Sequence, residues 1–244
     1  NKGKRVLLAS GAEPVLPVML SADLGPDPQE IGANLQAVQF QSSVLLERNW
    51  EEVKKLEAQY LKTPILKDVY GQELSILPGM DGALALNAIR EYYESGKYDV
   101  IVYNGTGDLN TLRMLGMPES ISWYVRRFRQ LFINSDLGKA ISDSPFIQPL
   151  ISTFLNVNPT ADNFSQPTNQ ANNFLDKGKK VLANPQQFSA FLVTTPDPME
   201  VVTSRYLWGS AQQVGLTIGG VIVISENGNS NVSEDFAPLQ VSNI

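Results

Sequence analysis

The chain of 244 residues contains no cysteine and no histidine. The absence of cysteine excludes disulfides, zinc fingers and a thiol nucleophile within this chain. The absence of histidine excludes a Ser-His-Asp triad, an imidazole metal site and the commonest general base in enzymes. Several large classes of catalytic and metal site are therefore excluded for these residues.

Positive charge and long apolar runs are also scarce. Acidic residues outnumber basic residues 25 to 19, which gives a net charge of −6. A nucleic-acid-binding chain normally carries a basic face, so we expect no nucleic-acid partner. No apolar run approaches the roughly 20 residues that span a bilayer, and no signal peptide precedes the first apolar run. We expect a soluble, cytoplasmic protein with no transmembrane segment.

The remaining pattern is that of an α/β protein. The length suits one α/β domain with an insertion or two small domains, and the hydrophobic content of 43% is ordinary. Apolar runs at 5–9, 99–103, 191–195 and 216–225 predict strands that are covered on both faces, which is typical of a mostly parallel sheet. We therefore predict an α/β fold with a mostly parallel sheet flanked by helices.

Other segments follow weaker patterns. Residues 35–40 alternate apolar and polar side chains, as a half-buried or edge strand does. Apolar residues recur at helical spacing within 43–60, 81–95 and 199–214. The tail after residue 227 is polar, and we expect it to be exposed.

The most informative segment is the strand-like run 98–103 and the turn that follows it. The turn contains Asn104, Gly105, Thr106, Gly107 and Asp108, and a helix-like segment comes next. Ligands bind at the carboxyl ends of strands in open α/β sheets, and the backbone amides of a glycine-rich turn suit phosphate oxygens. In this interpretation Asp108 holds Mg²⁺ through water. The alternative, favoured by residue types alone, is a turn shaped by two glycines with Asp108 as a helix cap.

This segment resembles the switch II region of the ArsA and tail-anchored-protein-targeting ATPases, a branch of the P-loop NTPases. In that family an apolar strand ends in an aspartate and a Thr-Leu-Arg core follows; here Asn104 stands at the aspartate position and residues 111–113 keep the core. Three further segments resemble the family in the same order, namely the second strand, the Pro-Gly-x-Asp segment and the late strand-helix-strand, at 3–10, 77–81 and 191–223. The resemblance spans residues 3–225.

The chain departs from the family at several functional positions. No Gly-x-x-x-x-Gly-Lys-Ser/Thr loop is present, so the resemblance implies a fragment that lacks the first strand, the P-loop and its helix. The switch I motif Asp-Pro-Ala-His is replaced by residues 11–14. Glu13 would position or activate a water there, whereas the alternative is an exposed acid on a proline-rich loop. The adenine-reading asparagine falls near Ile224. With these departures, the chain resembles a divergent branch of the family, of cyanobacterial or plastid type.

The resemblance implies an ATPase with ATP and Mg²⁺ as cofactors, acting as a nucleotide-driven homodimer that handles hydrophobic segments of client membrane proteins. It places the catalytic candidates at Glu13, Asn104 and Asp108, and the nucleotide contacts at Asn104, Gly105, Thr106 and Gly107. For a homologue of this type, the resemblance implies the plastid stroma as an alternative to the cytoplasm. The alternative function is a client-binding module that does not hydrolyse ATP and is gated by nucleotide or independent of it. An arsenite-pump role is weak, because no cysteine is present to bind the metalloid.

The resemblance also predicts three regions. The NTPase-like core occupies 1–118 and 186–244, and a helical insertion occupies 119–185. Apolar residues of the insertion would line a client groove: Trp123, Phe128, Leu131, Phe132, Phe146, Leu150, Ile151 and Phe154. The alternative is that they pack an ordinary helical subdomain. The five methionines are scattered, so a Met-rich adaptable surface is absent.

Overall fold

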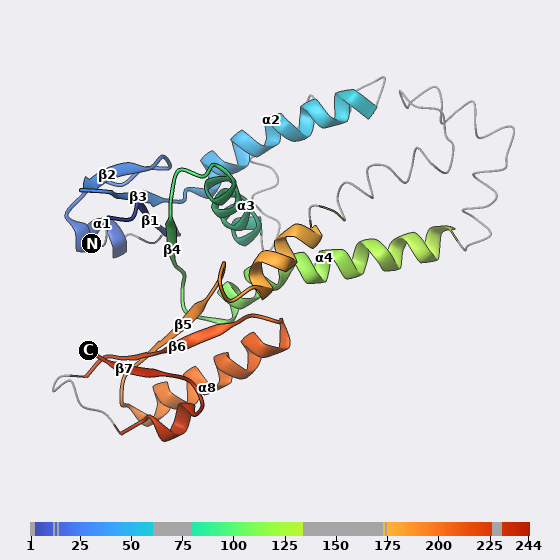
Figure 1. The fold of residues 1–244 in the computed structure, drawn as a ribbon. Coiled ribbons are helices and arrows are strands. Elements are labelled where there is room, and N and C mark those ends of the chain that lie inside the picture. Colours follow the sequence, from blue (N-terminus) through green and yellow to red (C-terminus); the bar gives the residue numbers. More distant parts are fainter. Residues whose placement is uncertain are drawn as a thin grey trace, which may run out of the picture. The chain divides into compact units, whose positions relative to one another are not determined.

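The computed structural model of the chain describes residues 3–11, 13, 15–60, 80–133, 173, 175–225 and 231–244. The chain divides into two compact units (Figure 1). The first contains residues 1–105 and 123–173, and the second contains residues 106–122 and 174–244. Most of the predicted insertion 119–185 lies outside the described residues, so its boundaries stay predictions.

The first unit contains a four-stranded sheet in the order β2-β3-β1-β4. Strand β1 (Val6–Ser10) pairs in parallel with β3 (Leu35–Gln39) and with β4 (Val100–Asn104). Strand β2 (Gln29–Gly32) is antiparallel to β3. A tight turn, in which Asn34 has φ 58°, connects the two strands. The mostly parallel α/β fold is confirmed. β3 is an internal strand rather than an edge strand, because β2, which the sequence pattern did not predict, pairs with its outer side.

Helices cover this sheet from both faces. On one face, helices α2 (Ser42–Tyr60) and α3 (Met80–Glu94) pack against each other, and Phe40 stacks between Tyr92 and Tyr103. On the other face, the short helix α1 (Val15–Leu20) buries Leu16 in a cluster with Leu24 and Ala37. The spacing of apolar residues predicted α2 and α3. It did not predict α1, whose Pro17 lies in the first turn, where proline is tolerated.

The prediction that the strands are covered on both faces is wrong for β4. Val100 and Val102 of this edge strand are 37% and 46% exposed, and their partners on the same side of β1, Val6 and Leu8, are only half-buried. The described residues thus leave these two valines partly exposed. One side of β4 is therefore an uncovered apolar strip.

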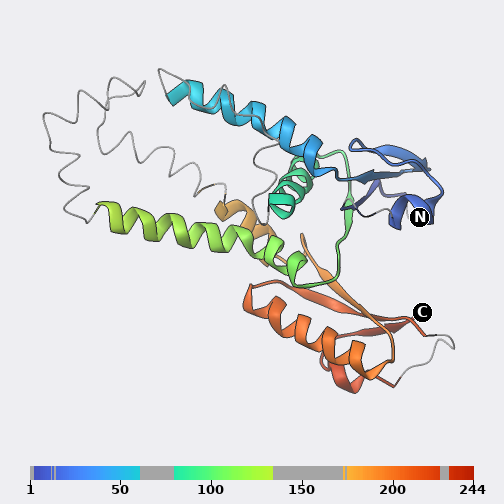
Figure 2. The ribbon, with the colours of Figure 1, turned by 180° about the vertical axis from the view of Figure 1, so that it is seen from behind.

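The second unit contains a three-stranded parallel sheet in the order β5-β6-β7 (Figure 2). Its strands are β5 (Ala190–Thr194), β6 (Ile218–Val223) and β7 (Val241–Asn243), and helix α8 (Pro198–Gln213) packs against β5. The core between α8 and the sheet consists of Leu192, Val201, Val221, Val223, Val232 and Phe236. The strands at 191–195 and 216–225 and the helix at 199–214 are thus confirmed.

One sequence prediction holds only in part in this unit, and another fails. Most of residues 231–244 are exposed as expected, but Phe236 of the short 3-10 helix η3 (Glu234–Phe236) is fully buried and β7 pairs with β6. The tail escapes a pattern-based prediction because its few apolar residues are isolated among polar ones. In addition, Phe191 and Val193 of β5 are each 58% exposed, since α8 covers only the opposite side of that strand.

A long helix, α4 (Leu109–Ile133), follows the turn after β4 and contains Pro118. Its first half belongs to the second unit, where Lys179 forms a 2.8 Å ion pair with Glu119 and Val214 lies against Gly116. The helix-like segment expected after the turn is therefore confirmed.

Candidate functional site

Three polar side chains lie in one row at the carboxyl edge of the first sheet. The register pairs Ser10 at the end of β1 with Gln39 at the end of β3 and with Asn104 at the end of β4. Parallel strands in register point equivalent side chains to the same face, so these three share a face. The row two residues earlier, Ala37, Leu8 and Val102, is entirely apolar. Polarity is thus confined to the edge at which ligands bind in open α/β sheets.

Ser10 carries the most informative atom of this row. Its side chain is 4% exposed, and its Oγ has no hydrogen-bond partner in the described part of the chain. An unsatisfied buried hydroxyl costs on the order of 1–3 kcal/mol, so it marks a position where a ligand or an ordered water supplies the missing partner. Sequence reasoning missed Ser10, although a serine that ends an apolar run directly before a glycine is a usable signal.

Gln39 fixes the loop that follows β1. Its side chain is 9% exposed, and its Nε2 donates a hydrogen bond of 3.0 Å to the backbone oxygen of Glu13. Sequence reasoning also missed Gln39. The sequence signal for Gln39 is its position in the alternating pattern of β3. It lies on the same side of the strand as Leu35 and Ala37, where an apolar residue is expected.

Glu13 is exposed and lies at the same edge. Burial is the main cause that raises the pKa of the Tyr103 phenol, and the negative charge of Glu13 raises it further. The carboxylate is therefore close enough to the end of β4 to act on a neighbour of Asn104. The structure thus brings Glu13 and Asn104 to the carboxyl ends of paired strands, while their catalytic roles stay predictions.

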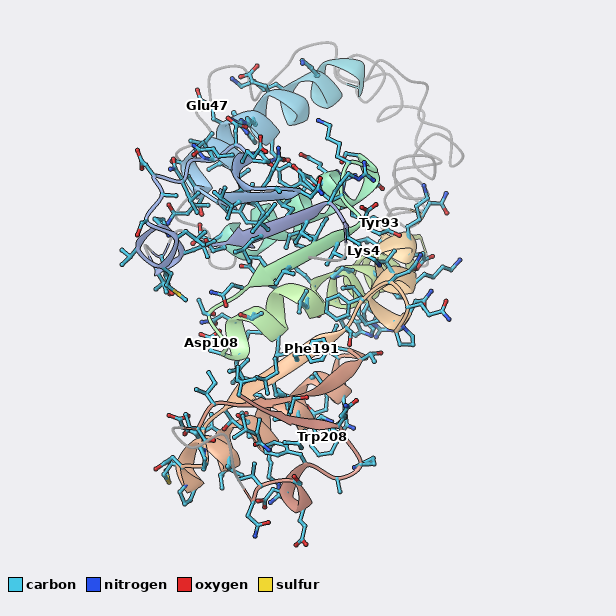
Figure 3. All side chains as sticks on the ribbon, turned by 60° about the vertical axis from the view of Figure 1, so that its left-hand side comes forward. Lys4, Glu47, Tyr93, Asp108, Phe191 and Trp208 are labelled. Atoms are coloured by element: carbon cyan, nitrogen blue, oxygen red, sulfur yellow. The ribbon has the colours of Figure 1, made fainter. Side chains whose placement is uncertain are left out.

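The turn after β4 is shaped as a helix start. Gly107 has φ 67°, a conformation that favours glycine. Asp108 precedes the first residue of α4 (Figure 3), and its Oδ1 accepts hydrogen bonds from the backbone amides of Asn110 at 2.9 Å and Thr111 at 3.2 Å. The Thr106 hydroxyl donates to the same oxygen at 2.6 Å, and Asn110 Nδ2 donates to Oδ2 at 2.9 Å.

These bonds describe an N-cap. The hydrogen bond from the Thr106 hydroxyl, followed by those from the backbone amides, holds the pKa of Asp108 below its ordinary value. Four donors already occupy the carboxylate, so little capacity remains for a metal-bound water. Of the two interpretations of Asp108, the geometry favours the helix cap.

The described residues offer few donors for the Mg²⁺ that the family implies. In the described residues no group of three or more Asp or Glu side chains is arranged to hold a metal ion. Mg²⁺ in nucleotide sites is held by one or two side chains together with the substrate phosphates, and the sequence contains no phosphate-binding loop. The described residues therefore do not fit a complete Mg²⁺ site, and no hydrolytic step follows from them alone.

The second sheet also ends in polar groups. Thr194 at the end of β5 is 3% exposed, and the backbone amide of Thr195 donates to Glu200 Oε2 at 3.1 Å. Asp197 caps α8 by accepting from the amides of residues 199 and 200. Ser225 Oγ, just beyond β6, is buried without a partner among the described residues. Ile224, the position near which the family's adenine-reading asparagine falls, is 50% exposed.

The structure tests little of the predicted client groove. Trp123 is 53% exposed on α4. The side chains of Phe128, Leu131, Phe132, Phe146, Leu150, Ile151 and Phe154 lie outside the described residues. Within the described ranges, none of the helices has the length and apolar character needed to cross a membrane.

Several known proteins are similar to this sequence. The family model described as anion-transporting ATPase matches residues 1–235. A "Putative arsenical pump-driving ATPase" of Chlorobaculum tepidum is 31% identical over 121 residues, which are 49% of this chain and 30% of that protein. "Putative arsenical pump-driving ATPase 1" of Aquifex aeolicus is 24% identical over 196 residues, which are 80% of this chain and 48% of that protein. The chain spans less than half the length of each relative. It belongs to the anion-transporting ATPase family.

Proposed function

We propose that this chain forms the nucleotide-sensing part of an ATP-dependent protein of the ArsA and tail-anchored-protein-targeting type. The observation that carries the proposal is the polar row of Gln39, Ser10 and Asn104 at the carboxyl edge of a parallel sheet, whose buried Ser10 hydroxyl has no partner among the described residues. Membership of an ATPase family supports nucleotide as the ligand of this edge.

In this function, phosphate binding and water positioning belong to different residues. The phosphate-binding loop is not among residues 1–244, so phosphate binding is assigned to residues outside them. Asn104 would donate to a phosphate oxygen or hold a water, but its amide cannot serve as a base. Glu13 is then the carboxylate at this edge best placed to orient a water. Mg²⁺, a nucleotide-driven homodimer and a groove for a hydrophobic client helix complete the proposal.

The second candidate function is a client-binding module that does not hydrolyse ATP. Two observations favour it. Asn104 stands where the family has an aspartate, and Asp108, the carboxylate of the turn, is occupied as a helix cap. A nucleotide bound at this edge would then change the conformation of the protein without being hydrolysed.

The test is nucleotide binding and turnover by the full-length protein in the presence of Mg²⁺, compared with Asn104→Asp and Glu13→Gln variants. Turnover by the parent that falls at least tenfold in Glu13→Gln supports the ATPase with Glu13 in the catalytic role. Binding without turnover, with turnover gained by Asn104→Asp, supports the non-hydrolysing module. If neither the parent nor the Asn104→Asp variant binds nucleotide, the proposed function is overturned.

A further inference from the structure

The turn after β4 begins with an asparagine followed by glycine, a pair in which the asparagine amide is chemically labile. The chain contains two Asn-Gly pairs, at 104–105 and 227–228, and the second lies outside the described residues. Glycine has no side chain to hinder the approach of its backbone nitrogen to the asparagine amide carbon. The attack closes a five-membered ring between groups that the chain already holds together, which favours it as an intramolecular reaction.

The surroundings of Asn104 leave both reacting groups free. Asn104 is exposed, and its side chain forms no hydrogen bond among the described residues. The backbone amide of Gly105 has no partner there either. A hydrogen-bonded amide would be held in place, and a buried one would be shielded from water. Neither protection applies to this pair in the described part of the chain.

The turn also permits the rotation that ring closure requires. Asn104 is the last residue of the ladder between β1 and β4, and residues 105 and 106 belong to no regular element. The next fixed point is Asp108, whose carboxylate caps α4. Gly105 and Gly107 lie between these two points and have the widest backbone freedom of any residue type. The Gly105 amide can therefore turn toward the Asn104 side chain without breaking a hydrogen bond of its own.

We propose that Asn104 is a site of self-modification, at which the chain converts its own amide into a carboxylate. The Gly105 nitrogen bonds to Cγ of Asn104, the bond from Cγ to Nδ2 breaks, and the nitrogen's proton leaves with Nδ2 as ammonia. A water molecule then opens the succinimide ring. Opening at Cγ restores the main chain and leaves an aspartate side chain, whereas opening at the backbone carbonyl carbon leaves an isoaspartate. Either product carries one more negative charge than the parent chain.

The place of the new charge gives it a consequence. Asn104 shares its row with Ser10 and Gln39, both uncharged, at the edge that the proposed function assigns to nucleotide. An amide at position 104 both donates and accepts hydrogen bonds, whereas a carboxylate only accepts them and can take up a proton. The aspartate product is also the residue that the family has at this position, and the isoaspartate product is not.

The consequence for nucleotide rests on the proposed function. The two candidate functions then correspond to two chemical states of one chain. The newly made chain, with an amide at position 104, is the client-binding module that does not hydrolyse ATP. The aspartate form is the ATPase. The fraction of the second form grows with the age of the protein and requires only water.

Peptide mass spectrometry of the folded chain during storage in neutral buffer tests the modification. Peptides that contain positions 104 and 227 are followed in the same sample, with the urea-unfolded chain as the reference. We expect deamidation at position 104 within about tenfold of its rate in the unfolded chain, because tenfold is only about 1.4 kcal/mol of activation free energy. Labelling by an isoaspartyl methyltransferase distinguishes isoaspartate from aspartate.

Two variants block the reaction in different ways. Asn104→Gln keeps an amide but requires a six-membered ring, and Gly105→Ala hinders the attacking nitrogen. Gly105 does not have a positive φ, so alanine fits the backbone. Each variant should slow deamidation at position 104 by about tenfold or more and leave position 227 as in the parent. A folded parent that keeps its amide at position 104 while the unfolded chain loses it, or a loss at equal rate in both variants, overturns the proposal.

Nucleotide turnover by the full-length protein tests the consequence. The parent is assayed newly purified and after storage, beside equally stored Asn104→Gln and new Asn104→Asp. Turnover that rises with storage in the parent, stays flat in Asn104→Gln and is present from the start in Asn104→Asp supports the two states. If the stored parent has lost its amide and gains no turnover while Asn104→Asp is active, isoaspartate is the product and the switch is overturned. If Asn104→Asp binds no nucleotide, the proposed function fails, and the mass measurement still decides whether position 104 is modified.

Discussion

Replacement of Asp108 separates a helix cap from a metal-binding carboxylate. Asp108→Ala removes the acceptor for the amides of Asn110 and Thr111 and for the Thr106 hydroxyl. Loss of an N-cap of this kind costs about 1 kcal/mol, with a range of roughly 0.5–2 kcal/mol. Asp108→Asn keeps an acceptor oxygen at the same place, and asparagine is as good an N-cap as aspartate. We therefore expect a clear fall in the free energy of unfolding for the alanine variant and a change within about 0.5 kcal/mol for the asparagine variant.

Urea unfolding of both variants, with and without Mg²⁺ and ATP, provides the measurement. If Asp108 acts only as a cap, Asp108→Asn also retains the nucleotide affinity of the parent. The pH dependence offers a further check. Because folding lowers the pKa of Asp108, the stability from its charged form is fully present above the ordinary pKa of aspartate and is lost as the pH falls through the lowered one. An alanine variant as stable as the parent, or an asparagine variant that loses Mg²⁺-dependent binding, would refute the assignment as a cap.

Three further predictions concern other residues. Phe236→Ala should lower the free energy of unfolding by about 3–5 kcal/mol in urea, because Phe236 is fully buried in the core under α8; a loss below about 1 kcal/mol would contradict that packing. Ser10→Ala should leave stability equal or higher, since an unsatisfied hydroxyl is removed, but should weaken nucleotide binding by the full-length protein; unchanged affinity would remove Ser10 from the site. Side-chain hydrogen bonds from Arg5 lower the pKa of Asp99 to about 2. In Arg5→Ala, carboxyl titration by NMR should therefore show the pKa of Asp99 moving up toward 3.8. A pKa that stays near 2 in this variant would argue against the pair.

Apolar periodicity was sufficient to predict most, but not all, of the elements whose side chains form the two cores. The helices α2, α3 and α8 and the strands β1, β4, β5 and β6 all follow runs or spacings that are visible in the sequence. Strands β2 and β7 were missed because they are short and are held mainly by backbone pairing with a neighbour. The burial of Phe236 was missed for a related reason, since a single aromatic residue in a polar tail cannot form a periodic apolar pattern.

The candidate site was predictable in location but not in detail. The polar turn after β4 and the loop of Glu13 could be assigned to the carboxyl edge because parallel strands end there. Ser10 and Gln39 were not singled out, since only the register shows that they align with Asn104. The role of Asp108 depended on which donors surround its carboxylate, and residue type alone does not determine that.

Among the described strands, the outer edges of β4 and β5 are unpaired and present backbone hydrogen-bonding groups to another molecule. Each strand contains five residues without a charge or a proline, and each lies at the edge of its sheet among the described strands. Natural proteins usually protect such edges with lysine, proline or a covering element, because a bare edge accepts a strand from another molecule. Short uncharged segments rich in strand-forming residues are also the ones that stack into fibrils. These two five-residue segments are therefore the places in the described part of the chain where we expect edge-to-edge pairing with another molecule.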